Sequence, residues 1–276
     1  MAARIFALLL ICWAGWGAPL PAGAEEWSHT PTKWQAVGRG LGFTQVEVLR
    51  DEEVVGSLAV VKIDPGANAF RVFHHSPQNI TSWQRELKAA VVFNASYYCQ
   101  DGKPCGLIIA DGKPIGPLRN SQMRGMFVAE PKGMSPDLPR ATILDLSLTP
   151  VNPQKLPWTQ GVQSFPLLLD SKERIRVRPS DKASHRTVVA TDHQGNILVF
   201  NTHSGQFTLY DLARFLKESA FEVETALNLD GGREAQLYIK TEELEYFSPR
   251  SWEVQLGSLL DPKEFWLPTV VAVFPR

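Results

Sequence analysis

The sequence predicts an α+β fold: a single domain with one large mixed β-sheet and a few helices packed on it. Short apolar runs typical of strands recur along the chain, whereas only two segments carry helix start signals. No linker or low-complexity stretch divides the 276 residues, a length that suits one domain. Hydrophobic residues make up 44% of the chain and charged residues 21%, which indicates a packed protein rather than a disordered one.

The predicted strands are short apolar or alternating runs bounded by turn residues. A turn at residues 64–66 is expected to pair the first two strands, and a turn at 193–196 predicts a hairpin. The Pro-rich region 132–159 is expected to be mostly loop. The predicted strands are, in order, residues 54–63, 70–73, 91–93, 107–109, 187–190, 197–200, 227–230, 236–239 and 269–274.

Two helices are predicted from their N-terminal capping residues. Thr81 or Ser82 caps a helix that runs to about Lys88. Thr208 caps the second, with Asp211 three residues later, as at the start of a capping box. The apolar face of this second helix is formed by Leu209, Leu212 and Leu216.

Residues 1–24 have the order of a secretory signal peptide: a weakly basic start, an apolar run and small residues before the expected cleavage point. The apolar run, residues 5–16, is shorter than the roughly 20 residues that cross a bilayer. We therefore expect cleavage after Ala24, a domain formed by residues 25–276, and no membrane span in the mature chain. The expected location is exported, either periplasmic or secreted.

The charge balance and the cysteines narrow the function further. Lys and Arg number 28 against 29 Asp and Glu, so the chain lacks the basic excess of a nucleic-acid-binding protein. Cys99 and Cys105 are separated by a turn sequence, and an oxidising compartment favours a disulfide between them over free thiols. A metal site is the third alternative, but no His/Cys cluster supplies further ligands, so neither a metal nor another cofactor is expected.

The strongest chemical signal is the strand end at residues 225–232, Thr-Ala-Leu-Asn-Leu-Asp-Gly-Gly. Strand side chains alternate, so Asn228 and Asp230 lie on one face. Gly231 and Gly232 let the backbone approach a ligand and point N–H groups at an anion. The alternative interpretation is an ordinary Asp-Gly hairpin turn.

Two further segments carry polar groups at strand ends. Asn94, Ser96, Tyr97 and Tyr98 follow a buried strand, and amide, hydroxyl and aromatic groups together suit a sugar; the alternative is a strand end with core aromatics. Arg186 stands directly before a strand, where a guanidinium can hold a phosphate or carboxylate through two hydrogen bonds. An ion pair at the surface is the alternative for this arginine.

In this order, the segments resemble those of the phosphodiester glycosidase family. The resemblance extends from about Val54 to the C-terminus and predicts a strand-rich exported domain. No segment is specific alone, but five in the same order are. The five are Phe93-Asn94-Ala95-Ser96-Tyr97-Tyr98, the hairpin Gly106–Lys113, Gln163-Ser164-Phe165-Pro166-Leu167-Leu168, Ser184-His185-Arg186 with the hairpin Asp192–Leu198, and Ala226–Gly232.

The resemblance implies a hydrolase that cleaves between a sugar anomeric carbon and a phosphate, so the expected partner is a phosphorylated or phosphodiester-linked carbohydrate. Asp230 would act as base or nucleophile, and Arg186 with the backbone of Gly231 and Gly232 would hold the phosphate. Asn94 would complete the catalytic set. The expected substrate contacts are Asn228, Gly231, Gly232, Tyr97, Ser164 and Glu234.

Two departures from the family pattern affect the expected site. Arg233 and Glu234 stand where small residues usually follow Asp-Gly-Gly, and they would narrow or recharge the site. Phe165 replaces a glycine of the Gln-Ser-Gly-Pro segment. Two other functions therefore remain open: a non-catalytic carbohydrate-binding protein of the cell envelope, and an assembly partner in exopolysaccharide export.

Overall fold

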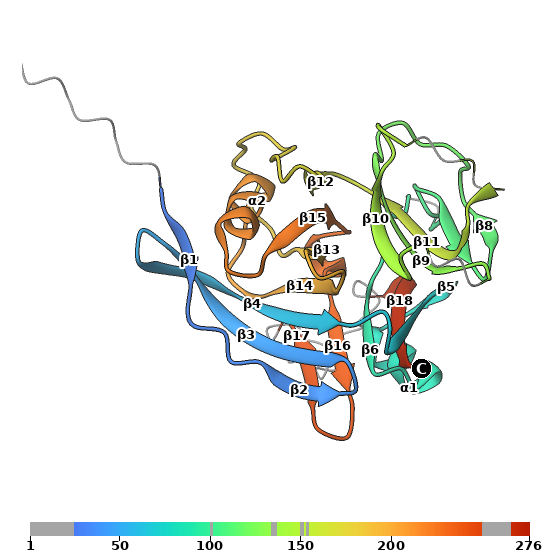
Figure 1. Cartoon of the computed structure of the whole chain (residues 1–276), viewed down its shortest axis with the longest axis horizontal. Coiled ribbons are helices and arrows are strands. Elements are labelled where there is room, and N and C mark those ends of the chain that lie inside the picture. Colours follow the sequence, from blue (N-terminus) through green and yellow to red (C-terminus); the bar gives the residue numbers. More distant parts are fainter. Residues whose placement is uncertain (1–24, 100–101, 134–136, 150–151, 153–154, 250–265) are drawn as a thin grey trace, which may run out of the picture.

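Strands dominate the structure and form three sheets (Figure 1). The computed structural model describes residues 25–99, 102–133, 137–149, 152, 155–249 and 266–276, so the predicted signal peptide lies outside the described residues. Every strand pair in the described ranges is antiparallel. The expectation of a sheet-dominated fold is thus confirmed, whereas that of one large mixed sheet is wrong.

The first sheet has eight strands in the order β1-β3-β4-β14-β13-β15-β12, with β2 paired to β3 off this path. The predicted hairpin is confirmed: β13 and β14 pair from Thr187 opposite Asn201 to Thr191 opposite Ile197. The strands are β1 (Trp27–His29), β2 (Gln35–Gly38), β3 (Leu41–Arg50), β4 (Glu53–Ile63), β12 (Leu167–Leu169), β13 (Thr187–Asp192), β14 (Ile197–Ser204) and β15 (Val223–Asn228).

Helix α2 (Leu209–Glu218) packs on this first sheet. Thr208 Oγ1 accepts a 3.0 Å hydrogen bond from the Asp211 N–H, which confirms the predicted cap. Leu212 and Leu216 are buried against apolar side chains of the sheet. The helix therefore covers one face of the sheet that carries the Asp-Gly-Gly segment.

The second sheet has the order β10-β9-β11-β7-β8 and lies at the upper right of Figure 1. The prediction of loop for residues 132–159 is wrong in part, because β10 and the start of β11 fall within it. The prolines that favoured a loop lie outside β10, whose five residues all pair with β9. The strands are β7 (Ile108–Ala110), β8 (Lys113–Ile115), β9 (Gly125–Pro131), β10 (Ala141–Asp145) and β11 (Trp158–Ser164).

The third sheet has the order β17-β16-β6-β18-β5. Helix α1 (Ile80–Leu87) packs on it through Trp83, whose indole N–H donates to the Leu267 carbonyl at 2.8 Å. Its cap is Asn79 rather than Thr81 or Ser82, because Asn79 Oδ1 already accepts the Ser82 N–H at 2.8 Å. The strands are β5 (Asn68–Gln78), β6 (Val91–Asn94), β16 (Leu237–Lys240), β17 (Glu245–Ser248) and β18 (Leu267–Pro275).

The predicted pairing of residues 54–63 with 70–73 is wrong. The turn after β4 instead carries the chain from the first sheet to the third, where β5 pairs with β18. Asp64 stabilises this turn: its Oδ1 accepts the Gly66 N–H at 2.7 Å, and its carbonyl accepts the Ala67 and Asn68 N–H groups. β4 is largely buried and β5 is partly buried, and each strand finds its partners in a different sheet.

The main apolar core lies between the three sheets. Val61 of β4, Val162 of β11 and Val271 of β18 are fully buried in the same cluster. Strand ends from all three sheets also meet at one place: Ser164 ends β11, Asn94 ends β6, and Asn228 ends β15. The predicted site residues are therefore brought together at the junction of the sheets.

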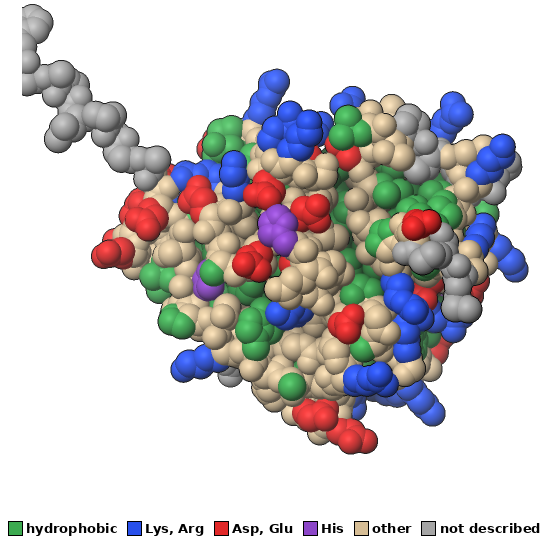
Figure 2. All heavy atoms as spheres, viewed as in Figure 1, with side chains coloured by type: hydrophobic (Ala, Val, Ile, Leu, Met, Phe, Trp, Pro, Cys, Tyr) green, Lys and Arg blue, Asp and Glu red, His purple; other side chains and the backbone are tan. Residues whose placement is uncertain are grey.

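Acidic and basic side chains are interspersed on the face seen in Figure 2, in keeping with a net charge of −1. Neither described helix has both the length and the apolar composition that crossing a bilayer requires.

Candidate active site

The Asp-Gly-Gly segment leaves β15 and passes between the first and third sheets. Beyond Asn228, the Asp230 N–H donates to the Ala95 carbonyl at 3.2 Å, and a short 3-10 helix, η2 (Gly232–Glu234), follows. A Cβ on Gly231 would lie 3.0 Å from the His185 carbonyl oxygen and 3.2 Å from Arg186 Nη1. Gly232 has a φ of +71°, which disfavours other residues. The glycines let this backbone approach the loop that carries Arg186.

The N–H groups of the two glycines are already paired within the protein. The Gly231 N–H donates to Asp230 Oδ1 at 2.9 Å, and the Gly232 N–H donates to the His185 carbonyl at 3.0 Å. The sequence led us to expect both groups to face an anion. In the structure they shape the loop and fix the Asp230 carboxyl instead.

Arg186 is held by neutral groups. Its Nε donates to the Phe207 carbonyl at 3.1 Å and its Nη2 to the Lys182 carbonyl at 2.8 Å. Its Nη1 lies against Gly231. Burial lowers the pKa of this guanidinium, and among the described residues no carboxylate forms an ion pair with it. Arg186 therefore brings a positive charge to the site that carbonyl groups orient but do not cancel.

Asp230 and Glu234 place two carboxyl groups in the site. Burial, together with the negative charge of Glu234, raises the pKa of Asp230 to about 7, against the opposing effect of the Gly231 N–H. The hydroxyl of Tyr98 donates to Glu234 Oε1 at 3.2 Å. A carboxyl group with a pKa near neutrality can both accept and release a proton under physiological conditions.

The hydroxyl of Tyr97 is close enough to both charged groups for each to affect its pKa. Burial and then the charge of Asp230 raise the pKa of its hydroxyl above the usual range, whereas the charge of Arg186 acts in the opposite direction. Asn228 Nδ2 donates to the Tyr97 hydroxyl oxygen at 2.8 Å. Asp230, Arg186 and Tyr97 therefore converge, although they come from three separate segments.

The buried amides support the site from behind. Asn94 is 1% exposed; its Nδ2 donates to the Asp230 carbonyl at 2.9 Å and its Oδ1 accepts the Gln236 N–H at 3.1 Å. Asn228 is also fully buried, and Ser164 Oγ donates to its carbonyl at 2.8 Å. These polar groups position the Asp230 loop; the sequence had led us to expect Asn94 in the catalytic set and Asn228 and Ser164 as substrate contacts.

Two side chains at this junction were not among the predicted site residues. Tyr98 was noted in the sequence as one of two aromatics that suit a sugar but was not assigned to the site, because its bond to Glu234 depends on the fold. Phe165 is 38% exposed, and its ring centroid lies 4.8 Å from that of Tyr97. An aromatic residue in place of a glycine was the signal in the sequence that could have identified Phe165.

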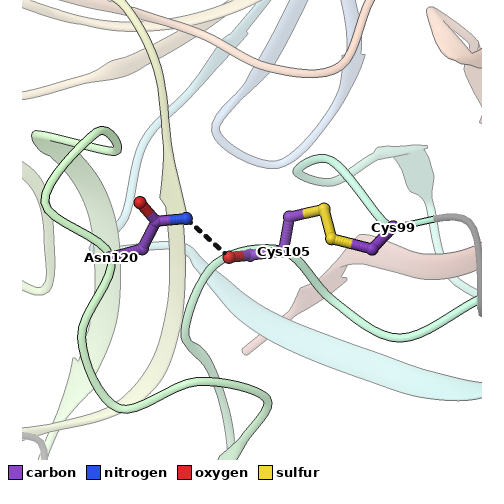
Figure 3. Close-up of a disulfide and its surroundings, with 3 residues drawn as sticks. All are labelled: Cys99, Cys105 and Asn120. Atoms are coloured by element: carbon purple, nitrogen blue, oxygen red, sulfur yellow. Dashed lines mark hydrogen bonds between the residues drawn. A yellow bond between two sulfur atoms is a disulfide. The ribbon is translucent and has the colours of Figure 1, made fainter.

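A disulfide joins Cys99 and Cys105 and closes the loop that follows Tyr98 (Figure 3). The Cys105 N–H donates to the Tyr97 carbonyl at 3.0 Å, and Asn120 Nδ2 donates to the Cys105 carbonyl at 2.8 Å. The bridge thus anchors the segment that presents both tyrosines. No group of three or more His, Cys, Asp or Glu side chains that could hold a metal ion occurs within the described part of the chain.

The fold and the site together define a class of protein. Its sheets are antiparallel, and a site with two carboxyl groups lies where the sheets meet. The sequence model of the phosphodiester glycosidase family matches residues 87–274, and the chain belongs to this family. That span contains every residue of the candidate site, including both carboxyl groups and Arg186.

Two solved structures have a similar fold. One is a crystal structure of a hypothetical protein from Synechocystis, with a TM-score of 0.59 and 15% identity, covering 93% of this chain and 69% of that one. The other is the catalytic domain of zebrafish N-acetylglucosamine-1-phosphodiester alpha-N-acetylglucosaminidase, auto-inhibited by its pro-peptide, with a TM-score of 0.56, 18% identity and coverage of 91% and 88%. No curated protein matches this chain significantly.

Proposed function

We propose that this chain hydrolyses sugar phosphodiesters at the bond between the anomeric carbon and a phosphate oxygen. Membership of the phosphodiester glycosidase family supports the class of reaction. The observation that carries the proposal is the convergence of Asp230, with a pKa of about 7, and the uncancelled charge of Arg186 around Tyr97. A base poised near neutral pH and a cation for a phosphate are the two groups that this reaction needs.

In the proposed reaction each of these groups has one role. Arg186 binds phosphate oxygens through Nη1, the guanidinium nitrogen that lies against Gly231. Asp230 accepts a proton from water as the water oxygen bonds to the anomeric carbon, and the bond from that carbon to the phosphate oxygen breaks. The bonding electrons leave with the phosphate, so the products are a free sugar and a phosphomonoester. The negative charge of Glu234 stabilises the positive charge that develops on the sugar.

The proposed setting is outside the cytoplasm, in the metabolism of envelope or exopolysaccharide glycans. The signal-peptide pattern of residues 1–24 supports export. A disulfide within the site region is typical of proteins in oxidising compartments. The zebrafish relative is named for cleaving an N-acetylglucosamine phosphodiester, which supports a carbohydrate substrate here as well.

Sugar 1-phosphodiesters of p-nitrophenol and of nucleosides test the proposal. With heavy-oxygen water, the label should enter the released sugar and the nitrophenyl group should remain on phosphate. Asp230→Asn should lower turnover at least about a thousandfold, because the base is lost. Asp137→Asn makes the same chemical change at an exposed position and should leave turnover unchanged.

Other products would contradict the proposal. Release of nitrophenol and sugar phosphate would show cleavage on the other side of the phosphorus. Near-normal turnover in Asp230→Asn would remove Asp230 from the mechanism. A folded wild-type protein with no turnover on the whole panel would favour a non-catalytic role in carbohydrate binding or glycan assembly.

A further inference from the structure

Phe165 is a large apolar side chain left partly in water beside the proposed site. It lies in the loop between β11 and β12, and 38% of it is exposed. Its ring packs against Tyr97 with 4.8 Å between centroids and 34° between the planes. Tyr97 supports one side of the ring, and the remaining surface of the ring faces solvent.

The backbone on both sides of Phe165 is tied to the strand that leads to Asp230. Asn228 Nδ2 donates to the Phe165 carbonyl at 3.2 Å, and the Asn228 N–H donates to the Pro166 carbonyl at 3.1 Å. Ser164 Oγ donates to the Asn228 carbonyl at 2.8 Å. The exposed ring is therefore held at a fixed position relative to the carboxyl group two residues beyond Asn228, as a binding surface requires.

Contacts within the site indicate which part of a substrate would reach this ring. Glu234, four residues after Asp230, is hydrogen-bonded to the Tyr98 hydroxyl at 3.2 Å. The ring of Tyr97 packs on Phe165, its hydroxyl accepts a 2.8 Å hydrogen bond from Asn228 Nδ2, and Arg186 Nη1 lies against Gly231. With the sugar to be cleaved at the two carboxyl groups and its phosphate on Arg186, the alcohol portion of the diester extends toward Phe165.

We propose that Phe165 and Tyr97 form a subsite, here called the ring subsite, for a ring carried by the alcohol portion of the phosphodiester. The chemistry it recognises is a flat apolar ring face, which both a pyranose and an aromatic ring present to a phenylalanine. An acyclic alcohol such as glycerol offers no such face. The ring subsite rests on the proposed function for its place in the reaction, and it makes Phe165 a specificity-determining residue.

Three diesters of one sugar 1-phosphate test the ring subsite, with p-nitrophenol, a hexose through its primary hydroxyl, or glycerol as the alcohol. Phe165→Leu keeps an apolar side chain but removes the ring, and it should raise KM two- to tenfold for the ring-bearing diesters, with kcat unchanged. The glycerol diester should not be affected. Phe165→Tyr keeps the ring and should stay within twofold of wild type for all three substrates.

Trp34→Leu is the matched control, because Trp34 is an aromatic residue with 37% exposure in another part of the chain, just before β2. It should leave all three KM values unchanged, and thermal melting of each variant shows that it is folded. An effect of Phe165→Leu on the p-nitrophenyl diester alone would assign the subsite to aromatic rings. An effect on the hexose diester alone would assign it to sugar rings. Equal effects on all three diesters, or none, would overturn the ring subsite.

Binding measurements distinguish a failure of the ring subsite from a failure of the proposed function. Calorimetric titration of the same three diesters can be carried out even where no turnover occurs. Weaker binding of only the ring-bearing diesters to Phe165→Leu would support the ring subsite although the hydrolytic function had failed. Turnover without any selectivity at Phe165 would support the function and reject the ring subsite.

Discussion

Asp230→Asn should stabilise the fold in alkaline solution while it abolishes turnover. The folded state raises the pKa of Asp230 from 3.8 to about 7, mainly because the carboxyl group is buried. Well below pH 3.8 this group is protonated in both the folded and the unfolded state, so its burial does not reduce stability there. As the pH rises to 7, the unfolded chain ionises freely and the folded protein does not, so stability is lost over this window.

The magnitude follows from the two pKa values. A difference of about three pH units, at about 1.4 kcal/mol each, corresponds to roughly 4 kcal/mol above pH 8 as an upper limit. Asparagine cannot ionise, and its side-chain oxygen can still accept the Gly231 N–H. The free energy of unfolding of Asp230→Asn should therefore exceed that of wild type by about 4 kcal/mol at most at pH 8.5 and by only about 1 kcal/mol at pH 4.5.

Urea unfolding measures this difference, with the fluorescence of the eight tryptophans as the signal, at pH 4.5, 6, 7 and 8.5. Asp137→Asn, at an exposed position, should show no such dependence on pH. A difference between Asp230→Asn and wild type that stays constant over this range would refute the argument that burial raises the pKa of Asp230. The argument would also be refuted if Asp230→Asn became less stable than wild type as the pH rises.

Two further predictions concern the neighbours of Asp230. Glu234→Gln removes the negative charge that helps to raise the pKa of Asp230. The acid limb of the pH profile of kcat/KM should therefore move to lower pH by about one unit. An unmoved limb would show that Glu234 does not contribute to the raised pKa of Asp230. Gly231→Ala places a Cβ 3.0 Å from the His185 carbonyl oxygen, so the loop must shift and kcat/KM should fall at least about tenfold; wild-type kinetics would show that the close approach is not needed.

Local signals in the sequence predicted local structure well. The hairpin around residues 193–196 and the helix capped by Thr208 depend on a few neighbouring residues, and both are confirmed. The partner of β5 is β18, which lies about 200 residues further along the chain. No turn sequence at residues 64–66 can encode that pairing, so the first two predicted strands were wrongly joined.

The site shows the same division between local and distant information. Asp230 and Arg186 were identified because each lies next to a predicted strand in a segment that resembles the family pattern, although a hairpin turn and a surface ion pair remained alternatives. The Gly231 and Gly232 N–H groups were expected to bind an anion, but their partners lie in the Asp230 side chain and the His185 carbonyl. Hydrogen bonds to a segment some 45 residues away cannot be foreseen from an Asp-Gly-Gly motif alone.

Glu234, which departs from the family pattern, affects the ionisation of Asp230. A small neutral residue at this position would leave only burial to raise the pKa of Asp230, so that the group would ionise at a lower pH. Glu234 adds a negative charge held by the Tyr98 hydroxyl, and it thereby shifts the ionisation of Asp230 toward neutrality. The glutamate thus moves the pKa of the acid–base group of the proposed reaction toward neutral pH.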